Sequence, residues 1–145
     1  MSVAAHNDFT RTLLLWSAPL IVAHFFAVLW HLRLLVTVQP GTPAFLPPLL
    51  ICINIIPIAG LFVFARGFPV LAGSMVTLPL GVALVSGAYA HFLTSGRDNV
   101  LHMPPGPYRF SFQASAISLV VLEAAGCWAG LRMLVSGGRS AKRRA

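Results

Sequence analysis

The chain has 145 residues, of which 57% are hydrophobic and only 9% are charged, and its formal net charge is +7. A water-soluble domain carries about 25% charged residues, so the composition excludes a soluble globular fold and predicts an all-α integral membrane protein. The charge does not indicate nucleic-acid binding, because half of the basic residues form a C-terminal cluster suited to anionic lipid headgroups: Arg132, Arg139, Lys142, Arg143 and Arg144.

Four apolar stretches are each long enough to cross the hydrocarbon of a bilayer, which takes about 20 helical residues. They cover residues 12–32, 48–65, 70–93 and 111–134. Backbone polar groups in lipid need partners within their own segment, so each stretch is expected to be a helix. The chain is therefore predicted to form one transmembrane domain, 1–145, folded as a four-helix bundle, in which 135–145 is a basic cytoplasmic tail.

Prolines lie inside the first three spans, at Pro19, Pro57 and Pro79, where each removes a backbone hydrogen bond and favours a kink. In the fourth span, "GCWAG" places Gly126 and Gly130 four residues apart. This spacing lets two helix backbones approach closely, and we expect it to mark packing within the bundle.

The distribution of basic residues predicts the orientation, because cytoplasmic loops are enriched in Lys and Arg. An even number of spans places both termini on one side, together with Arg11, Arg66, Arg132, Arg139, Lys142, Arg143 and Arg144, whereas the other side holds Arg33, Arg97 and Arg109. This excess predicts that both termini are cytoplasmic. We expect the protein to lie in the inner (cytoplasmic) membrane of a bacterium.

Three polar residues lie at similar depth near the bilayer centre when residues are counted along each span: His24, Asn54 and Glu123. Glu123 is the only acidic residue within any span. A lone carboxylate in hydrocarbon is costly, so we expect Glu123 to be neutral or paired with His24, with Asn54 completing the group. Two interpretations stay open: a binding site for a proton or small ligand, or inter-helix hydrogen bonds that fix the bundle.

The stretch "GRDNVLHMPPGPYRF", residues 96–110, is the predicted outer connection between the third and fourth spans. "GRDN" is typical of a turn in which Asp98 or Asn99 bonds nearby backbone, and prolines stiffen "MPPGPY". With the adjoining span ends, this stretch forms a candidate outer rim of His31, Arg33, His91, Arg97, Asp98, His102, Tyr108 and Arg109. The rim is either a site for an anion or lipid headgroup, or a solvated loop whose arginines reach lipid phosphates.

No metal site or cofactor is predicted. The two cysteines, Cys52 and Cys127, lie within apolar runs and lack the spacing of a zinc site. His31 and His91 match in depth and are the best pair for a haem or a metal, but no second pair lies at the depth of His24. Hydrogen bonding is the better explanation of these histidines.

The chain contains no nucleotide-binding, zinc-protease or serine-hydrolase motif, so its function must be inferred from its polar residues. Three hypotheses follow. The chain is a subunit or partner of a larger membrane assembly, or a carrier or binder of a proton, lipid or small molecule at the midplane residues, or a membrane enzyme at the outer face. The first hypothesis best fits the apolar character, the tight loops and the lack of a catalytic motif.

Overall fold

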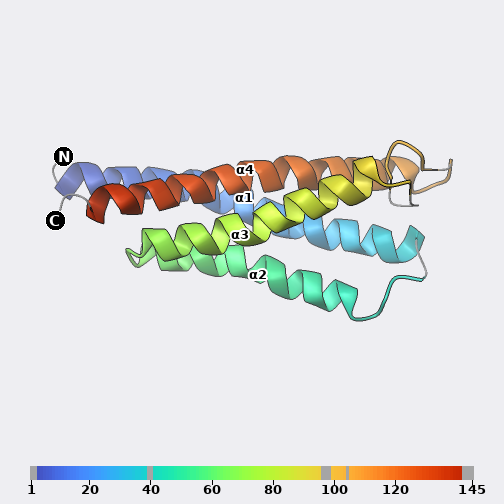
Figure 1. The fold of residues 1–145 in the computed structure, drawn as a ribbon, viewed down its shortest axis with the longest axis horizontal. Helices are drawn as coiled ribbons and strands as arrows, with labels where there is room; N and C mark the ends of the chain where they lie inside the picture. The colour runs from blue at the N-terminus through green and yellow to red at the C-terminus, as the bar shows by residue number, and fades with distance from the viewer. Residues whose placement is uncertain (1–2, 39–40, 96–98, 104, 142–145) are drawn as a thin grey trace.

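The computed structural model describes residues 3–38, 41–95, 99–103 and 105–141. The chain order is α1 (Val3–Val38), α2 (Leu46–Ala65), α3 (Pro69–Ala88), the short π-helix η1 (Tyr89–Leu93) and α4 (Arg109–Ala141) (Figure 1). The predicted all-helical architecture with four long helices is confirmed.

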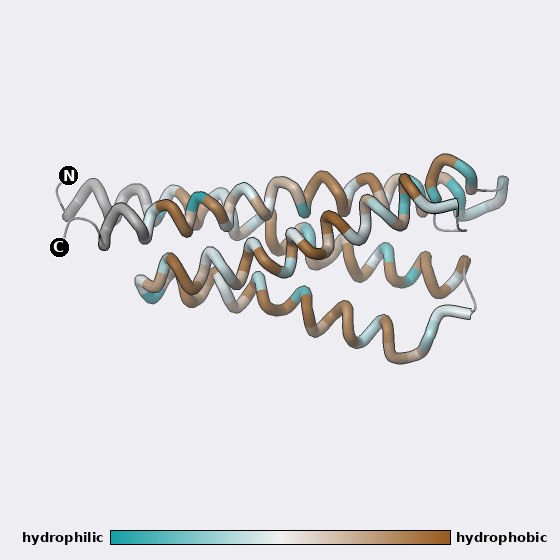
Figure 2. The backbone as a smooth tube through the Cα atoms, in the orientation of Figure 1, coloured by the Kyte–Doolittle hydropathy of each residue, from teal (hydrophilic) through white to brown (hydrophobic). Residues whose placement is uncertain are grey.

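All four helices are long and apolar enough to cross a membrane. The two shortest α-helices, α2 and α3, each have 20 residues, which corresponds to about 30 Å of rise. No more than 39% of the most apolar window of any helix is buried inside the bundle, and many large apolar side chains are exposed. Figure 2 shows this hydrophobic character along the length of each helix. Such a surface is compatible with lipid as the surrounding solvent.

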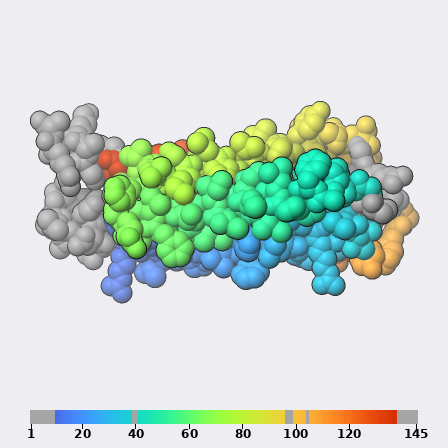
Figure 3. All heavy atoms as spheres, turned by 90° about the horizontal axis from the view of Figure 1, so that it is seen from below, coloured from blue at the N-terminus to red at the C-terminus, as the bar shows by residue number. Residues whose placement is uncertain are grey.

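The helices pack as a closed ring in which α1 contacts α2 and α4, while α3 also contacts α2 and α4. The most extensive packing is between α3 and α4. In the view of Figure 3, α2 lies between α1 and α3. α1 begins and α4 ends at the same end of the bundle, and both extend beyond the turn that joins α2 to α3 (Figure 1).

Two of the helices are longer than the sequence indicates. α1 runs from Val3 to Val38 instead of 12–32, and α4 continues to Ala141 through most of the expected tail at 135–145. An apolar run stops where polar residues begin, but a helix stops only where its backbone hydrogen bonds stop. Arginine and serine are compatible with a helix, so a prediction from hydropathy underestimates the lengths of these two helices.

Prolines begin two helices and do not end the three that contain them. α2 and α3 each have a proline in the first turn, where the missing N–H is not needed. Pro19, Pro57 and Pro79 lie within α1, α2 and α3, which continue past them. The turn between α2 and α3 contains Gly67 with a φ of +87°, a left-handed conformation that favours glycine.

Glycines allow α3 and α4 to approach closely, as the spacing of Gly126 and Gly130 predicts. A Cβ atom added at Gly130 would lie 2.9 Å from the backbone nitrogen of Thr77 and 3.1 Å from the carbonyl oxygen of Gly73. A Cβ atom added at Gly73 would lie 2.7 Å from the carbonyl oxygen of Gly130. The two backbones are therefore in contact, and no larger residue fits at either position without moving a helix.

Candidate functional site

A buried histidine and a buried carboxylate face each other between α1 and α4. The Nε2 atom of His24 lies 3.6 Å from the Oε1 atom of Glu123. His24 is 1% exposed and Glu123 is 5% exposed. The two residues come from neighbouring helices of the ring, so the packing of α1 on α4 sets the distance between them. We call these two residues the midplane pair.

The midplane pair has unused hydrogen-bonding capacity. Within the described part of the chain, neither His24 Nε2 nor Glu123 Oε2 has a hydrogen-bond partner. The separation of 3.6 Å between Nε2 and Oε1 is an ion-pair distance and is too long for a good hydrogen bond. Unsatisfied polar atoms are costly in an apolar interior, so such an arrangement marks either strain or a place for another group.

Gly87 of α3 borders the open side of the carboxylate. A Cβ atom placed at Gly87 would lie 3.6 Å from Glu123 Oε2, which is ordinary van der Waals contact. The absence of a side chain at Gly87 therefore leaves space beside the oxygen atom that has no partner. Gly87 could not be singled out from the sequence, because a single glycine within a membrane helix is common.

Asn54 does not join the pair. It is buried on α2, and its Nδ2 atom donates a hydrogen bond of 2.8 Å to the carbonyl oxygen of Leu50 in the same helix. No hydrogen bond connects Asn54 to His24 or Glu123 among the described residues. Counting residues along a helix gives the depth of a side chain but not its direction around the axis. The expected hydrogen-bonded group of three is therefore reduced to a pair.

A second polar cluster lies nearer the other end of the bundle. The rings of His31 and His91 meet edge to face, with centroids 4.9 Å apart and an interplanar angle of 78°. The ring of Phe112, which is fully buried, lies 4.9 Å from that of His31. Nδ1 of His31 is 2.9 Å from the hydroxyl of Ser115. We call these four residues the outer cluster.

The hydroxyl of Ser115 orients the His31 ring. This hydroxyl donates its single proton to the carbonyl oxygen of Phe112 at 2.8 Å. With that proton donated to Phe112, the hydroxyl oxygen would accept from His31, which requires the tautomer that carries its proton on Nδ1. In the neutral ring this leaves Nε2 as the acceptor. Ser115 was not selected from the sequence, although it lies eight residues from Glu123 while His31 lies seven from His24.

The connection after η1 is tied to the bundle by hydrogen bonds. Asn99 donates to the carbonyl oxygen of Thr94 at 2.6 Å, and its Oδ1 atom accepts from the backbone N–H of Leu101 at 2.8 Å, as the predicted turn requires. Gln113 donates to the carbonyl oxygen of Val100 at 2.6 Å, and the N–H of Val100 donates to the carbonyl oxygen of His91 at 2.9 Å. His91 lies within η1, and such π-helical turns are frequent at functional sites.

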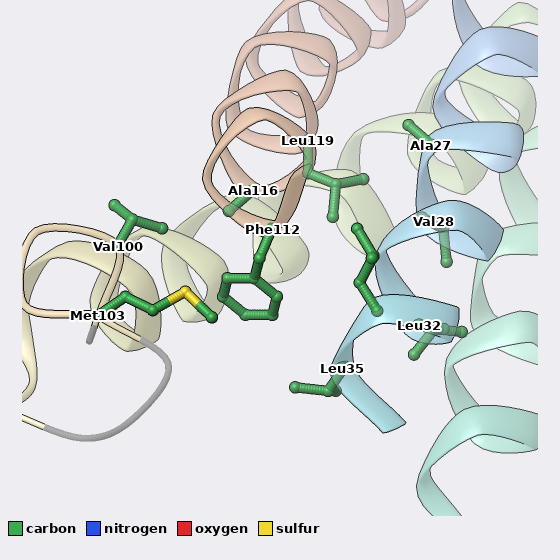
Figure 4. Packing of buried hydrophobic residues seen from close by; sticks show 10 residues of the cluster. Ala27, Val28, Leu32, Leu35, Val100, Met103, Phe112, Ala116 and Leu119 are labelled. Carbon is green, nitrogen blue, oxygen red and sulfur yellow. The ribbon is translucent and has the colours of Figure 1, made fainter. Parts of the chain in front are cut away.

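Apolar side chains from this connection enter the core. Val100 and Met103 are buried in one cluster with Phe112, Ala116 and Leu119 of α4. Figure 4 shows the Met103 side chain extending toward the Phe112 ring. Val100 and Met103 therefore anchor the described part of this connection to the core of the bundle.

The remaining described residues of the expected outer rim are not buried with the two histidines. The side chains of Arg33, His102, Tyr108 and Arg109 are exposed. Arg97 and Asp98 lie outside the described residues. The rim is therefore divided into the buried outer cluster and a set of exposed residues at the end of the bundle.

The outer cluster and the midplane pair are separate sites. His24 and His31 lie seven residues apart on α1, or about 10.5 Å along the helix. The buried apolar residues Ala27, Val28, Ala116 and Leu119 occupy the intervening level of α1 and α4. This layer interrupts any continuous line of hydrogen-bonding groups between the two sites.

The described residues contain no group of three or more His, Cys, Asp or Glu side chains arranged to hold a metal ion. His31 and His91 contact each other edge to face, whereas two axial ligands of one haem would face the iron from opposite sides. Cys52 and Cys127 are free thiols.

No protein-family model matches this chain, and no curated protein or solved structure matches it significantly.

Proposed function

We propose that this chain is an integral membrane protein with four spans, that both termini are cytoplasmic, and that it resides in a bacterial cytoplasmic membrane. The outward-facing apolar side chains support insertion, because their exposure to water would be unfavourable. The grouping of Arg11, Arg66 and Arg132 at the end where α1 begins supports the orientation.

Within the membrane, the proposed function is proton binding at the midplane pair. The observation that carries this proposal is that His24 Nε2 and Glu123 Oε2 are buried side by side without hydrogen-bond partners among the described residues. Polar groups that only fix a bundle would use their hydrogen-bonding capacity on each other or on the backbone, as Asn54 and Ser115 do. Unused capacity in the interior supports an exchangeable occupant.

The net charge of the midplane pair depends on the number of protons that it holds. With one titratable proton, the pair is either an imidazolium with a carboxylate or an imidazole with a carboxylic acid, and both forms have no net charge. A second proton gives a net charge of +1, and loss of the proton gives −1. Either change leaves an uncompensated charge in an apolar interior, which is costly. Loading or unloading the pair should therefore be coupled to hydration or to movement of α1 against α4.

The hypothesis of a subunit in a larger assembly has weaker support. It rests on exposed apolar residues and short connections, which a protein surrounded only by lipid also has. The outer-face enzyme hypothesis is weaker still, because His31 and His91 are buried while His102 is exposed. We therefore rank proton binding at the midplane pair first.

Infrared spectroscopy can test proton binding directly, because the chain contains only three acidic side chains. The protein is reconstituted in lipid vesicles, and difference spectra are recorded over a pH series. We expect a carboxyl band that disappears in Glu123→Gln, persists in the control Asp98→Asn, and changes frequency in His24→Gln. If Glu123→Gln leaves the difference spectra unchanged, or if His24→Gln leaves the Glu123 band unchanged, the midplane pair does not bind the proton.

A transport assay then asks whether the bound proton crosses the membrane. Vesicles containing a pH-sensitive dye are driven by a potassium diffusion potential, with wild type compared against Glu123→Gln. Proton flux that exceeds that of empty vesicles, and that Glu123→Gln abolishes, would identify a carrier. Flux equal to that of empty vesicles would restrict the pair to binding without transport.

A further inference from the structure

A groove lies between α1 and α4 on the side of the midplane pair that is toward the termini. It has a volume of about 430 Å³. On α1 it follows one face of the helix from Thr12 through Trp16 to Leu20. On α4 it follows Ala125, Ala129 and Arg132. Eight residues of helix correspond to about 12 Å, so the groove extends from the end of the bundle well into its apolar part.

Residue size explains why a groove forms here although the two helices pack together. Ala125 and Ala129 lie four residues apart on α4 and provide a low floor. Trp16 and Trp128 form the walls and are themselves 76% and 60% exposed. The groove is therefore an apolar channel open to the surroundings, with the dimensions of a narrow extended chain and not of a helix.

Arg132 occupies the end of the groove nearest the termini. Its guanidinium lies 5.5 Å from the centroid of the Trp128 ring, a distance at which cation–π attraction holds a cation. Tryptophan prefers the level of the lipid headgroups, so this pair places a positive charge where lipid phosphates lie. Arginine suits a phosphate because it can donate two parallel hydrogen bonds.

The charge at this end of the bundle complements an anion. Arg11, Arg66 and Arg132 all lie toward this end of the bundle, and all three are exposed. The acidic side chain that the structure describes, Glu123, is buried in the midplane pair. An apolar groove that ends at an arginine therefore matches the two parts of an anionic lipid. The groove can accommodate an acyl chain, and the arginine can bind the phosphate.

We propose that the α1–α4 groove binds one anionic phospholipid. One acyl chain lies over Ala125 and Ala129 between the two tryptophans, and the phosphate accepts hydrogen bonds from Arg132. This site requires membrane insertion but not proton binding, so each proposal can fail without the other. The occupant comes from the leaflet in contact with the termini, because Arg132 lies at that end.

Native mass spectrometry of the detergent-purified, delipidated protein tests the site with two lipids of equal acyl chains, phosphatidylglycerol and phosphatidylcholine. We expect the first bound lipid to be preferentially phosphatidylglycerol. Arg132→Gln should reduce that preference by about fivefold, the contribution expected of one basic residue next to an anionic headgroup. The matched control, Arg66→Gln, removes the same charge from the same end of the bundle outside the groove and should retain the preference.

A second pair of variants tests the apolar part of the groove. Ala125→Phe fills the floor and should weaken the first binding event for both lipids, whereas Ala124→Phe, at an exposed neighbouring position outside the groove, should not. Size-exclusion chromatography confirms that each variant is folded. Equal losses in Arg132→Gln and Arg66→Gln would overturn the proposal in favour of general attraction to a basic surface. Undiminished binding by folded Ala125→Phe would show that the acyl chain lies elsewhere.

Discussion

Gly87 of α3 lies directly beside the carboxylate of Glu123, where an added Cβ atom would stand 3.6 Å from Oε2. A methyl group at position 87 would therefore fit without a clash. It would occupy the space beside Oε2, the oxygen atom that has no hydrogen-bond partner among the described residues. A single methyl group can therefore separate the role of that space from the role of the midplane pair itself.

The variant Gly87→Ala should fold at least as well as wild type, because alanine is favoured over glycine within a helix by about 0.5–1 kcal/mol. If a water molecule or another small group reaches Oε2, the methyl group should displace it and shift the infrared band of Glu123 to the frequency of a less hydrogen-bonded carboxyl. Thermal unfolding in detergent provides the folding control. An unshifted band in a folded variant would mean that nothing exchanges through this space.

The contact between Gly130 and Thr77 gives a prediction about stability. In Gly130→Ala the new methyl group would collide with the backbone and hydroxyl of Thr77, so α3 and α4 would have to separate. We expect a loss of about 1–3 kcal/mol, which is typical of overpacking in a well-packed interior. Gly81→Ala is the matched control on the same interface, because its methyl group would meet Cys127 Sγ at 3.8 Å. Equal unfolding temperatures for the two variants would contradict the close approach.

The hydrogen bond between Ser115 and His31 gives a prediction about the outer cluster. Ser115→Ala leaves Nδ1 of His31 buried without its acceptor, which costs about 1–3 kcal/mol. Ser118→Ala should have little effect, because the Ser118 hydroxyl bonds only to Ala114 of its own helix. Thermal unfolding measures both variants. Nitrogen NMR shifts of the His31 ring report the tautomer, and a mixture of tautomers in wild type would contradict donation from Nδ1.

Cysteine labelling tests the proposed orientation. In a background in which Cys52 and Cys127 are replaced by alanine, Ser95→Cys should react with a membrane-impermeant maleimide added to intact cells. Ser140→Cys should react only after the cytoplasmic side is made accessible. The reverse pattern would invert the protein in the membrane and transfer the lipid groove to the opposite leaflet.

The sequence predicts those features that depend on distance along a helix. Few backbone conformations can satisfy their hydrogen bonds within lipid, so four apolar stretches of sufficient length are enough to predict four helices. Counting residues also assigns His24 and Glu123 to one level, and the structure has them 3.6 Å apart. The spacing of Gly126 and Gly130 predicts close packing within the bundle, because small residues four apart lie on one face of a helix, and the structure has this contact between α3 and α4.

Counting residues along a helix could not predict features that depend on the direction in which a side chain leaves the helix axis. Asn54 lies at the expected depth but bonds to its own backbone, and nothing in residue counting distinguishes the two outcomes. The π-helix at His91 involves a hydrogen bond from Val100, a residue beyond the turn, so it depends on the tertiary fold.

The midplane pair joins the first helix of the chain to the last. In the proposed membrane topology, α1 would insert before α4 is synthesised, so His24 would face lipid or a transient neighbour until Glu123 arrives. Closure of the pair is then one of the final events of assembly. A chain released before α4 is complete would keep a buried imidazole without its acid partner and would lack the helix with which α3 packs most extensively. The same two residues that we propose to hold a proton would thus distinguish a finished molecule from an unfinished one, a distinction that membrane quality-control proteases can act on.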